Sequence, residues 1–171
     1  MPESSFAQVY EENYSYIYNY VYMMLLHREN TEDVVGEAFV KAMNGYGAFD
    51  ETRASVRTWL CAIARNTALD HLKSAKRRES QTLEDAPEPY IEDEYALLQQ
   101  DANRQAFTAL SALKPEEREF LTLRYKLELS NEEIAQLTGS NAKAVSEKYR
   151  RLLLKCRGVL EKAGIHAEDV I

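Results

Sequence analysis

Residues 58–78 read TWLCAIARNTALDHLKSAKRR. This stretch begins beside Trp59, the only tryptophan of the chain, and ends in a cluster of lysines and arginines. Apolar residues recur in it at helical spacing, which predicts a helix over residues 56–75. The stripe that should face the core consists of Val56, Leu60, Ile63 and Thr67. A second stripe combines an aromatic ring, an amide and cations, at Trp59, Asn66, Asp70, Lys73 and Arg77. Such a stripe suits nucleic acid, since cations bind phosphates, amides bind base edges and rings stack on bases. The alternative is a solvated face with a half-buried tryptophan at its edge.

The composition of the 171-residue chain, with only 6 glycines and 4 prolines, favours an all-α protein of one mid-sized domain or two small ones. No apolar run approaches the roughly 18 residues of a membrane span, and the N-terminus lacks a signal sequence, so we expect no membrane insertion. Cys61 and Cys156 lack CxxC spacing and the 3 histidines are scattered, which favours a reduced, cytoplasmic protein without a metal site. Because there is no Gly-rich phosphate loop and no acid–base or nucleophile constellation, we expect neither a cofactor nor enzymatic activity.

Charge is distributed unevenly along this chain, whose formal net charge is -7. Residues 79–94, ESQTLEDAPEPYIEDE, contain Pro87 and Pro89 and no lysine or arginine, which predicts a flexible acidic linker. One basic cluster precedes the linker and another lies near the C-terminus. A polyanion can dock on these clusters despite the net acidity. The pattern predicts two small helical domains, residues 1–78 and 95–171, joined by this linker.

The N-terminal domain should contain two helices before the Trp59 helix. Periodicity predicts one helix over residues 6–26 and a break over residues 27–30. Thr31 is expected to begin the next helix, with acids in its first turn where the helix dipole favours them. Asn44 and Gly45 should end it, and residues 45–55 should form a loop.

The C-terminal domain should contain a helix-turn-helix. Helices are predicted over residues 95–113 and 115–126, the second beginning at Pro115. In it, the residues expected to be buried or partly buried are Phe120, Leu121, Leu123 and Tyr125. Ser130 and Glu133 form a capping box, and Ala135, Gly139 and Val145 have the spacing of two packed helices joined by a tight turn. The core stripe of the last helix is Val145, Tyr149, Leu152 and Cys156, and its basic outer face favours DNA binding.

Three segments together resemble the extracytoplasmic-function (ECF) class of bacterial RNA polymerase sigma factors. They are TEDVVGEAFVKA at residues 31–42, RTWLCAIARNTALDHLKSAKRR at residues 57–78 and ALSALKPEEREFLTLRYKLELSNEEIAQLTG at residues 109–139. The similarity extends over residues 6–160. It implies a dissociable initiation subunit that binds the clamp helices and the flap of core RNA polymerase and recognises promoter DNA. It also implies regulation by an anti-sigma factor that covers both domains.

The resemblance assigns three groups of residues. Contacts to the polymerase clamp would come from Asp33, Gly36 and Glu37. Recognition and melting of the −10 element would involve the loop over residues 45–55, which forms a pocket for a flipped base in this family, and the residues Phe49, Trp59, Asn66, Lys73, Lys76, Arg77 and Arg78. Recognition of the −35 element in the major groove would involve Asn141, Ala142, Lys143, Ser146, Glu147, Arg150 and Arg151.

Two positions depart from the family pattern, and two other functions are compatible with the sequence. Gly36 stands where the family usually has glutamine, and Glu147 lies in a segment where basic residues are common. One alternative is a stand-alone helix-turn-helix regulator whose N-terminal half is a sensor or dimerisation domain. The other is a helical interaction protein that binds no DNA. The Trp59 helix with Asn66 argues against the first, and the two basic clusters argue against the second.

Overall fold

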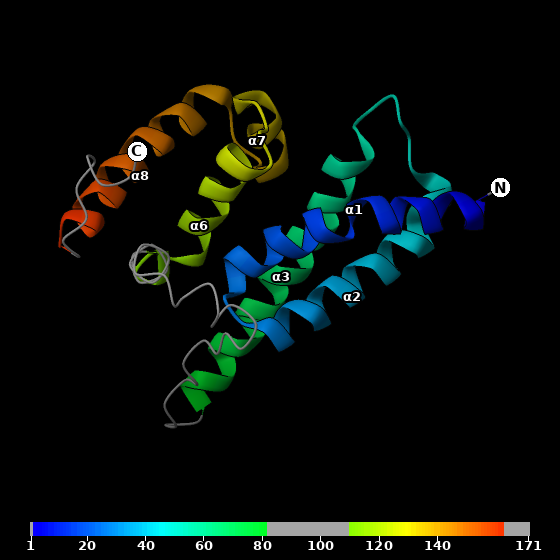
Figure 1. Cartoon of the computed structure of the whole chain (residues 1–171), viewed down its shortest axis with the longest axis horizontal. Coiled ribbons are helices and arrows are strands. Elements are labelled where there is room, and N and C mark those ends of the chain that lie inside the picture. The colour runs from blue at the N-terminus through cyan, green and yellow to red at the C-terminus, as the bar shows by residue number, and fades with distance from the viewer. Residues whose placement is uncertain (1, 82–109, 163–171) are drawn as a thin grey trace. The chain divides into compact units, whose positions relative to one another are not determined.

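The computed structural model describes residues 2–81 and 110–162, and all regular secondary structure in these residues is helical, which confirms the all-α prediction. The elements are α1 (Pro2–Leu25), α2 (Arg28–Gly45), the 3₁₀ turn η1 (Tyr46–Ala48), α3 (Val56–Gln81), α6 (Pro115–Leu121), the π turn η2 (Thr122–Lys126), α7 (Asn131–Thr138) and α8 (Ala142–Lys162) (Figure 1). The chain divides into two compact units, Met1–Tyr90 and Ile91–Ile171. Most of the predicted linker, and the predicted helix before Leu110, lie outside the described residues. The proposed boundaries of the linker therefore remain a prediction.

The first unit is a bundle of α1, α2 and α3, in which each helix packs on the other two. α1 and α2 lie side by side with opposed chain directions (Figure 1). Its fully buried side chains include Ile17, Tyr20, Val21, Met24, Val34, Val35 and Cys61. On α3 the core positions are Leu60, Cys61, Ala64, Thr67 and Ala68, whereas Val56 and Ile63 of the predicted stripe are only half-buried. The buried stripe of α3 thus contains small side chains, which let the helix approach its neighbours closely.

The start of α2 differs from the prediction, because the helix begins at Arg28 rather than at Thr31. The imidazole Nδ1 of His27 caps the helix by accepting a hydrogen bond from the backbone N–H of Asn30 at 3.2 Å. Thr31 is fully buried inside the first turn, and its hydroxyl donates to the carbonyl of His27 at 2.6 Å. Sequence reasoning chose threonine because it is a common N-cap residue, but histidine supplies the acceptor here.

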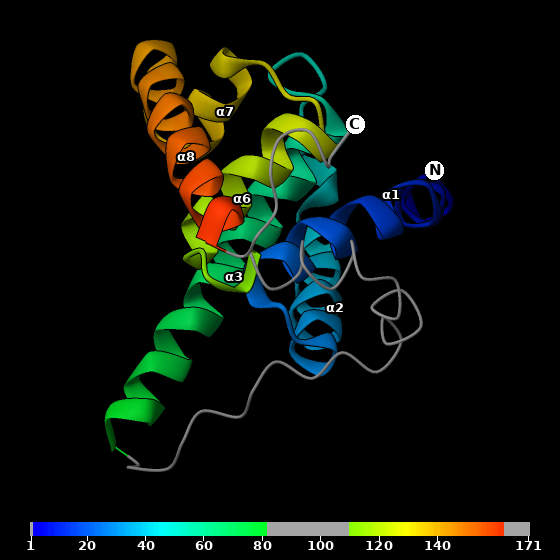
Figure 2. The same ribbon diagram turned by 60° about the vertical axis from the view of Figure 1, so that its left-hand side comes forward.

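The end of α3 also differs, because the helix continues from Ala75 through the basic cluster to Gln81. Lysine, arginine, glutamate and glutamine are all good helix formers, and Arg78 lies in the last turn, where the helix dipole favours cations. The C-terminal part of α3 extends beyond α1 and α2 (Figure 2). As a result, the basic cluster is carried on a rigid helix rather than on a loop.

The second unit is built from α6, η2, α7 and α8. Its core includes Phe120, Leu123, Ile134, Val145, Tyr149 and Leu152. The prediction that Tyr125 is buried or partly buried is wrong, since 60% of its surface is exposed. The N–H of Leu127 bonds the carbonyl of Thr122 at 2.9 Å, so the chain takes a wider π turn here. Phe120, Leu123 and Leu127 are buried at steps of three and four residues, and Tyr125, two residues after Leu123, lies on the opposite side of the helix.

The helix-turn-helix has the local geometry that the sequence predicts (Figure 2). The hydroxyl of Ser130 accepts from the N–H of Glu133 at 3.2 Å, and the capping box opens α7. Gly139 has a φ of +71°, a left-handed conformation that glycine adopts without strain. Ala135 and Val145 are both buried where α7 meets α8. Across residues 2–81 and 110–162, none of the helices is both long enough and apolar enough to cross a membrane.

Candidate nucleic-acid interface

An aromatic cluster holds the loop that follows α2 against the first turn of α3. The ring of Phe49 lies 4.8 Å from the indole of Trp59, measured between centroids, and Tyr46 lies 6.2 Å from the same indole. Tyr46 also packs on Phe6 of α1 at 5.4 Å. Trp59 is half-buried in these contacts, in agreement with the alternative that placed it at the edge of a solvated face. Its ring therefore positions the loop.

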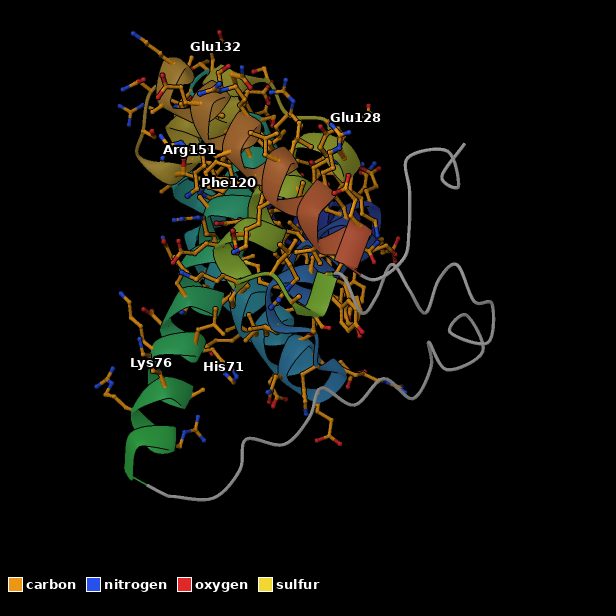
Figure 3. All side chains as sticks on the ribbon, turned by 90° about the vertical axis from the view of Figure 1, so that its left-hand side faces the viewer. His71, Lys76, Phe120, Glu128, Glu132 and Arg151 are labelled. Carbon is orange, nitrogen blue, oxygen red and sulfur yellow. The ribbon has the colours of Figure 1, made fainter. Side chains whose placement is uncertain are left out.

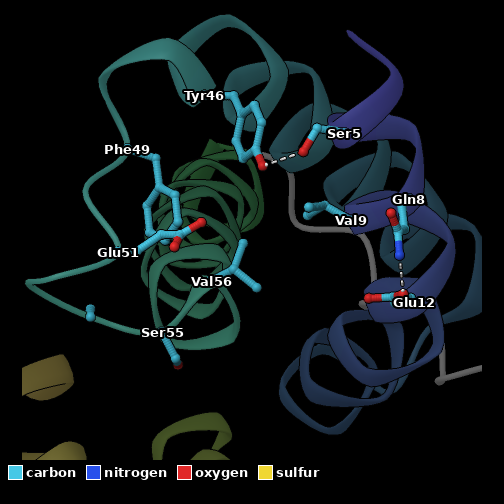
Figure 4. Close-up of a pocket in the computed structure, with 10 residues that line it drawn as sticks. Ser5, Gln8, Val9, Glu12, Tyr46, Phe49, Glu51, Ser55 and Val56 are labelled. Atoms are coloured by element: carbon cyan, nitrogen blue, oxygen red, sulfur yellow. Dashed lines mark hydrogen bonds between the residues drawn. The ribbon is translucent and has the colours of Figure 1, made fainter. Parts of the chain in front are cut away.

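The loop over residues 46–56 and the N-terminal half of α1 line an open cavity of about 380 Å³ (Figure 4). Tyr46, Phe49 and Val56 line it from the loop and the start of α3, whereas Gln8, Val9 and Glu12 line it from α1. The hydroxyls of Ser5 and Tyr46 lie 3.0 Å apart and link the two walls. The predicted residue Phe49 thus takes part in a concave site.

The remaining predicted residues of α3 are exposed along the same helix. Asn66 and Asp70 are exposed in its middle. The cations at its end, all exposed, are Lys73, Lys76, Arg77 and Arg78. Lys76 lies on the part of α3 that projects from the unit (Figure 3). At 1.5 Å per residue, the 20 residues from Val56 to Lys76 separate the cavity from these cations by about 30 Å. The structure therefore arranges the cavity, the amide of Asn66 and the cations in that order along one helix.

The predicted clamp-binding residues lie on the solvent-facing side of α2. Asp33, Gly36 and Glu37 are all exposed, and a Cβ on Gly36 would meet no atom within 4 Å. The same helix exposes 54% of Val40 and 54% of Met43, so this face is partly apolar.

His71 lies on α3 close to this acidic part of α2. Burial lowers the pKa of His71 below its ordinary value of 6.5, and the Arg78 cation lowers it further. Asp33 and Glu37 act in the opposite direction on the same pKa. His71 therefore favours the neutral form, and the charge of this end of α3 comes from its lysines and arginines.

In the second unit, the predicted recognition segment forms the first half of α8. Asn141 caps the helix, its Oδ1 accepting from the N–H of Ala144 at 2.9 Å, and Ala142 is half-buried. Five further predicted residues are exposed on α8, namely Lys143, Ser146, Glu147, Arg150 and Arg151. Arg151, labelled in Figure 3, is exposed and pairs with Glu147 at 3.7 Å. Glu147 thus partly neutralises a cation of this surface.

Contacts between α8 and α6 hold the recognition segment in place. The hydroxyl of Tyr149 donates to the backbone carbonyl of Phe120, and the ammonium of Lys148 lies 4.0 Å from the centre of the Phe120 ring. Lys155 pairs with Glu117 at 2.7 Å. Burial alone would raise the pKa of Glu117, but the hydrogen bonds from Lys155 and from the Lys114 N–H bring it below its ordinary value.

Sequence reasoning missed the residues that α1 contributes to the first unit's site. Gln8 and Glu12 form a hydrogen-bonded pair on the cavity wall. Asn13 is buried, and its Oδ1 accepts from Nε of Arg57 at 2.9 Å, which ties α1 to α3. The four-residue spacing of Gln8 and Glu12 signals a surface pair on a helix, but nothing local indicates that the loop folds over it. Within the described residues no cluster of His, Cys, Asp or Glu could hold a metal ion.

Two family models match the two units. Sigma-70 region 2 matches residues 9–78, and Sigma-70, region 4 matches residues 104–156. The chain is 31% identical over 144 residues to the ECF RNA polymerase sigma factor BldN of Streptomyces coelicolor, covering 82% of this chain and 54% of that protein. It is 30% identical over 169 residues to the RNA polymerase sigma factor YlaC of Bacillus subtilis, covering 93% of this chain and 94% of that protein. The chain belongs to the ECF class of RNA polymerase sigma factors.

Two solved structures share the fold of this ECF protein. The sigma factor RpoE of Bartonella quintana, in complex with the anti-sigma factor NepR, superposes with a TM-score of 0.72 at 18% identity, covering 92% of this chain and 97% of that chain. CnrH, in complex with the cytosolic domain of CnrY, gives a TM-score of 0.67 at 21% identity, covering 94% of this chain and 90% of the CnrH chain. The chain thus spans about half the length of BldN but nearly all of YlaC and of the RpoE and CnrH chains in these two structures.

Proposed function

We propose that this ECF sigma factor directs core RNA polymerase to specific promoters and helps to open the −10 element. Family membership supports the general role, and the order of cavity, amide and cations along α3 supports the opening step. The protein acts in the cytoplasm as a non-enzymatic subunit, and the polymerase carries out the chemistry of transcription.

The first unit captures unwound DNA. Opening a duplex costs a few kcal/mol per unstacked base step, and a protein offsets this only by binding the single-stranded form better than the duplex. A pocket for one base and a stacking surface discriminate in this way, each stacked base contributing roughly 1–3 kcal/mol, whereas phosphate contacts alone discriminate weakly. In this proposal the cavity beside Phe49 receives one flipped base, and Asn66 contacts a neighbouring base. The cations Lys73, Lys76, Arg77 and Arg78 hold the backbone.

The second unit reads intact duplex at the −35 element. The N-terminal half of α8 enters the major groove, where Lys143, Arg150 and Arg151 bind phosphates or guanine edges and Ser146 contributes a hydroxyl. The carboxylate of Glu147 is suited to accept a hydrogen bond from the amino group of cytosine. The exposed face of α2 with Asp33, Gly36 and Glu37 binds the clamp helices of the polymerase, and the second unit docks on the flap.

An anti-sigma factor is the proposed regulator. RpoE of Bartonella quintana has been solved with the anti-sigma factor NepR, and its fold is shared by this chain. A partner that covers the two DNA-binding surfaces would keep the protein inactive until it is released.

The proposal is tested by transcription in vitro with core polymerase and a promoter selected from a randomised library. We expect initiation only when the chain is added, and weak binding of free duplex by the chain alone. A stand-alone regulator would bind duplex tightly and give no initiation, and an interaction protein would do neither.

The opening step is tested with Asn66→Ala. Loss of one base contact of roughly 1–2 kcal/mol should reduce promoter opening by about tenfold, measured by permanganate reactivity. Binding to core polymerase should stay within about twofold, a difference of only about 0.4 kcal/mol. Asn44→Ala, which removes an exposed amide of α2, serves as the control. Equal losses of opening and core binding in Asn66→Ala would contradict the role of Asn66.

A further inference from the structure

The cavity beside Phe49 has two chemically different walls (Figure 4). The loop wall presents the rings of Tyr46 and Phe49, which lie 6.1 Å apart and within 12° of parallel. The α1 wall presents the polar side chains of Gln8 and Glu12. A planar base that enters between these walls can place its face against an aromatic ring and its edge toward α1.

The hydrogen bond between Gln8 and Glu12 determines whether the α1 wall offers donors or acceptors to the edge of the base. Nε2 of Gln8 donates to Oε1 of Glu12 at 2.9 Å. A carboxylate only accepts, so the amide must turn its nitrogen toward Glu12, and its own carbonyl oxygen is left as a second acceptor. Among residues 2–81 and 110–162, Oε2 of Glu12 has no hydrogen-bond partner. The α1 wall therefore offers acceptors to whatever enters the cavity.

The acidic side chains also decide which part of a DNA strand can enter. Glu12 and Glu51 both line the cavity, and two carboxylates repel a phosphate group. A base edge with an N–H donor is instead attracted to them. The cavity thus favours a base over the backbone, while the cations that suit phosphates lie at the far end of α3.

Of the four DNA bases, adenine, cytosine and guanine carry an exocyclic amino group, whereas the one donor on the edge of thymine, N3–H, lies between two carbonyl oxygens that a carboxylate repels. Glu12 is exposed at the mouth of the cavity, and a thymine carbonyl facing its carboxylate would be repelled and would find no donor there. We propose that Glu12, positioned by Gln8, determines specificity in this cavity by accepting a hydrogen bond from the exocyclic amine of the flipped base and rejecting thymine. This inference rests on the proposed function, because it assigns a base class to the same −10 pocket.

The test uses the holoenzyme and a selected promoter whose −10 region is held open by mismatches, so that base capture is measured apart from duplex melting. Each non-template base of the opened region is replaced in turn by an analogue of the same shape that lacks the amine: deoxyuridine for dC, deoxynebularine for dA and deoxyinosine for dG. With the unmodified chain, one position should lose transcript yield by at least about tenfold, the factor that corresponds to 1.4 kcal/mol.

Glu12→Gln should reduce this loss to about twofold or less, because a carboxamide can both donate and accept and so tolerates either edge. Glu11→Gln makes the same change of charge on the adjacent exposed position of α1, which does not line the cavity, and should keep the full discrimination. If no position depends on the amine, or if the two variants behave alike, the role of Glu12 is wrong while the sigma function stands. If the chain supports no initiation on any template, the proposed function fails, and the inference fails with it.

Discussion

The indole of Trp59 lies against the ring of Phe49, with centroids 4.8 Å apart and planes inclined by 35°. This contact joins the first turn of α3 to the loop that forms one wall of the cavity. Tyr46 touches both rings, so three aromatic side chains determine where the loop lies. The shape of the cavity therefore depends on packing between residues that are distant from its polar wall.

Replacing Phe49 by alanine should loosen this loop. Because Phe49 is half-buried, we expect a loss of about 1–2 kcal/mol in the free energy of unfolding, less than for a fully buried ring. The chain has 1 tryptophan, so its fluorescence reports on the surroundings of this one indole, and the emission should shift to longer wavelength when the Phe49 ring is removed. Tyr125→Ala, at a ring that is 60% exposed in the other unit, is the control and should change neither quantity. Unchanged tryptophan emission in Phe49→Ala would contradict the packing.

Replacing Gly36 should stabilise the first unit. Gly36 lies inside α2 with open space around the position of a Cβ, so Gly36→Ala gains helix propensity without a clash and should add about 1 kcal/mol to the free energy of unfolding. Urea unfolding followed by Trp59 fluorescence measures this directly. No gain, or a loss, would show that the glycine backbone is needed at this position.

Gly36→Gln separates stability from polymerase binding. If this face of α2 contacts the clamp, a longer polar side chain should raise affinity for core polymerase by about twofold to tenfold over Gly36→Ala, the range of one hydrogen bond worth 0.5–1.5 kcal/mol. Equal affinities of the two variants would place the clamp contact elsewhere.

The helix caps and turns of this fold could largely be predicted from the sequence, because each depends on only a few neighbouring residues. The capping box at Ser130 and the tight turn at Gly139 are both present as predicted. In the structure Gly139 makes this turn with a left-handed φ of +71°. The prediction that α2 begins at Thr31 is wrong. The imidazole of His27, four residues earlier, accepts the hydrogen bond that caps the helix. The prediction that Tyr125 is buried is wrong because Tyr125 does not fall on the buried stripe of Phe120, Leu123 and Leu127.

The cavity could not be predicted in the same way. It exists because the loop after α2 folds over α1, a placement marked by the hydrogen bond between Ser5 and Tyr46 across a sequence separation of 41. Helical periodicity finds which side of α1 is buried, but it does not show what covers the polar side. Only the tertiary structure therefore places the Gln8–Glu12 pair on the wall of a cavity.

Two substitutions in the second unit should change stability in opposite directions through the backbone alone. Glu128 has a φ of +54°, a conformation that is unfavourable for residues with a Cβ by roughly 1–2 kcal/mol, so Glu128→Gly should stabilise by about 1 kcal/mol. Gly139 has a φ of +71°, and a Cβ at this position would meet no atom within 4 Å, so Gly139→Ala should destabilise by about 1 kcal/mol without any steric clash. Urea unfolding followed by far-ultraviolet circular dichroism measures both. Shifts of the same sign in both variants would be inconsistent with this argument.

Removing two cations from α8 should weaken the −35 interaction in a salt-dependent way. Arg150 and Arg151 are exposed on the segment proposed for the major groove, and each phosphate contact contributes about 0.9 to the slope of log K against log salt concentration. The double variant Arg150→Ala with Arg151→Ala should therefore reduce that slope by up to about 1.8 for holoenzyme on duplex −35 DNA. Arg157→Ala is the matched control, because Arg157 lies beyond this segment and pairs with Glu161 at 3.2 Å. An unchanged slope in the double variant, or the same loss per charge in Arg157→Ala, would place the DNA-binding surface on another part of the unit.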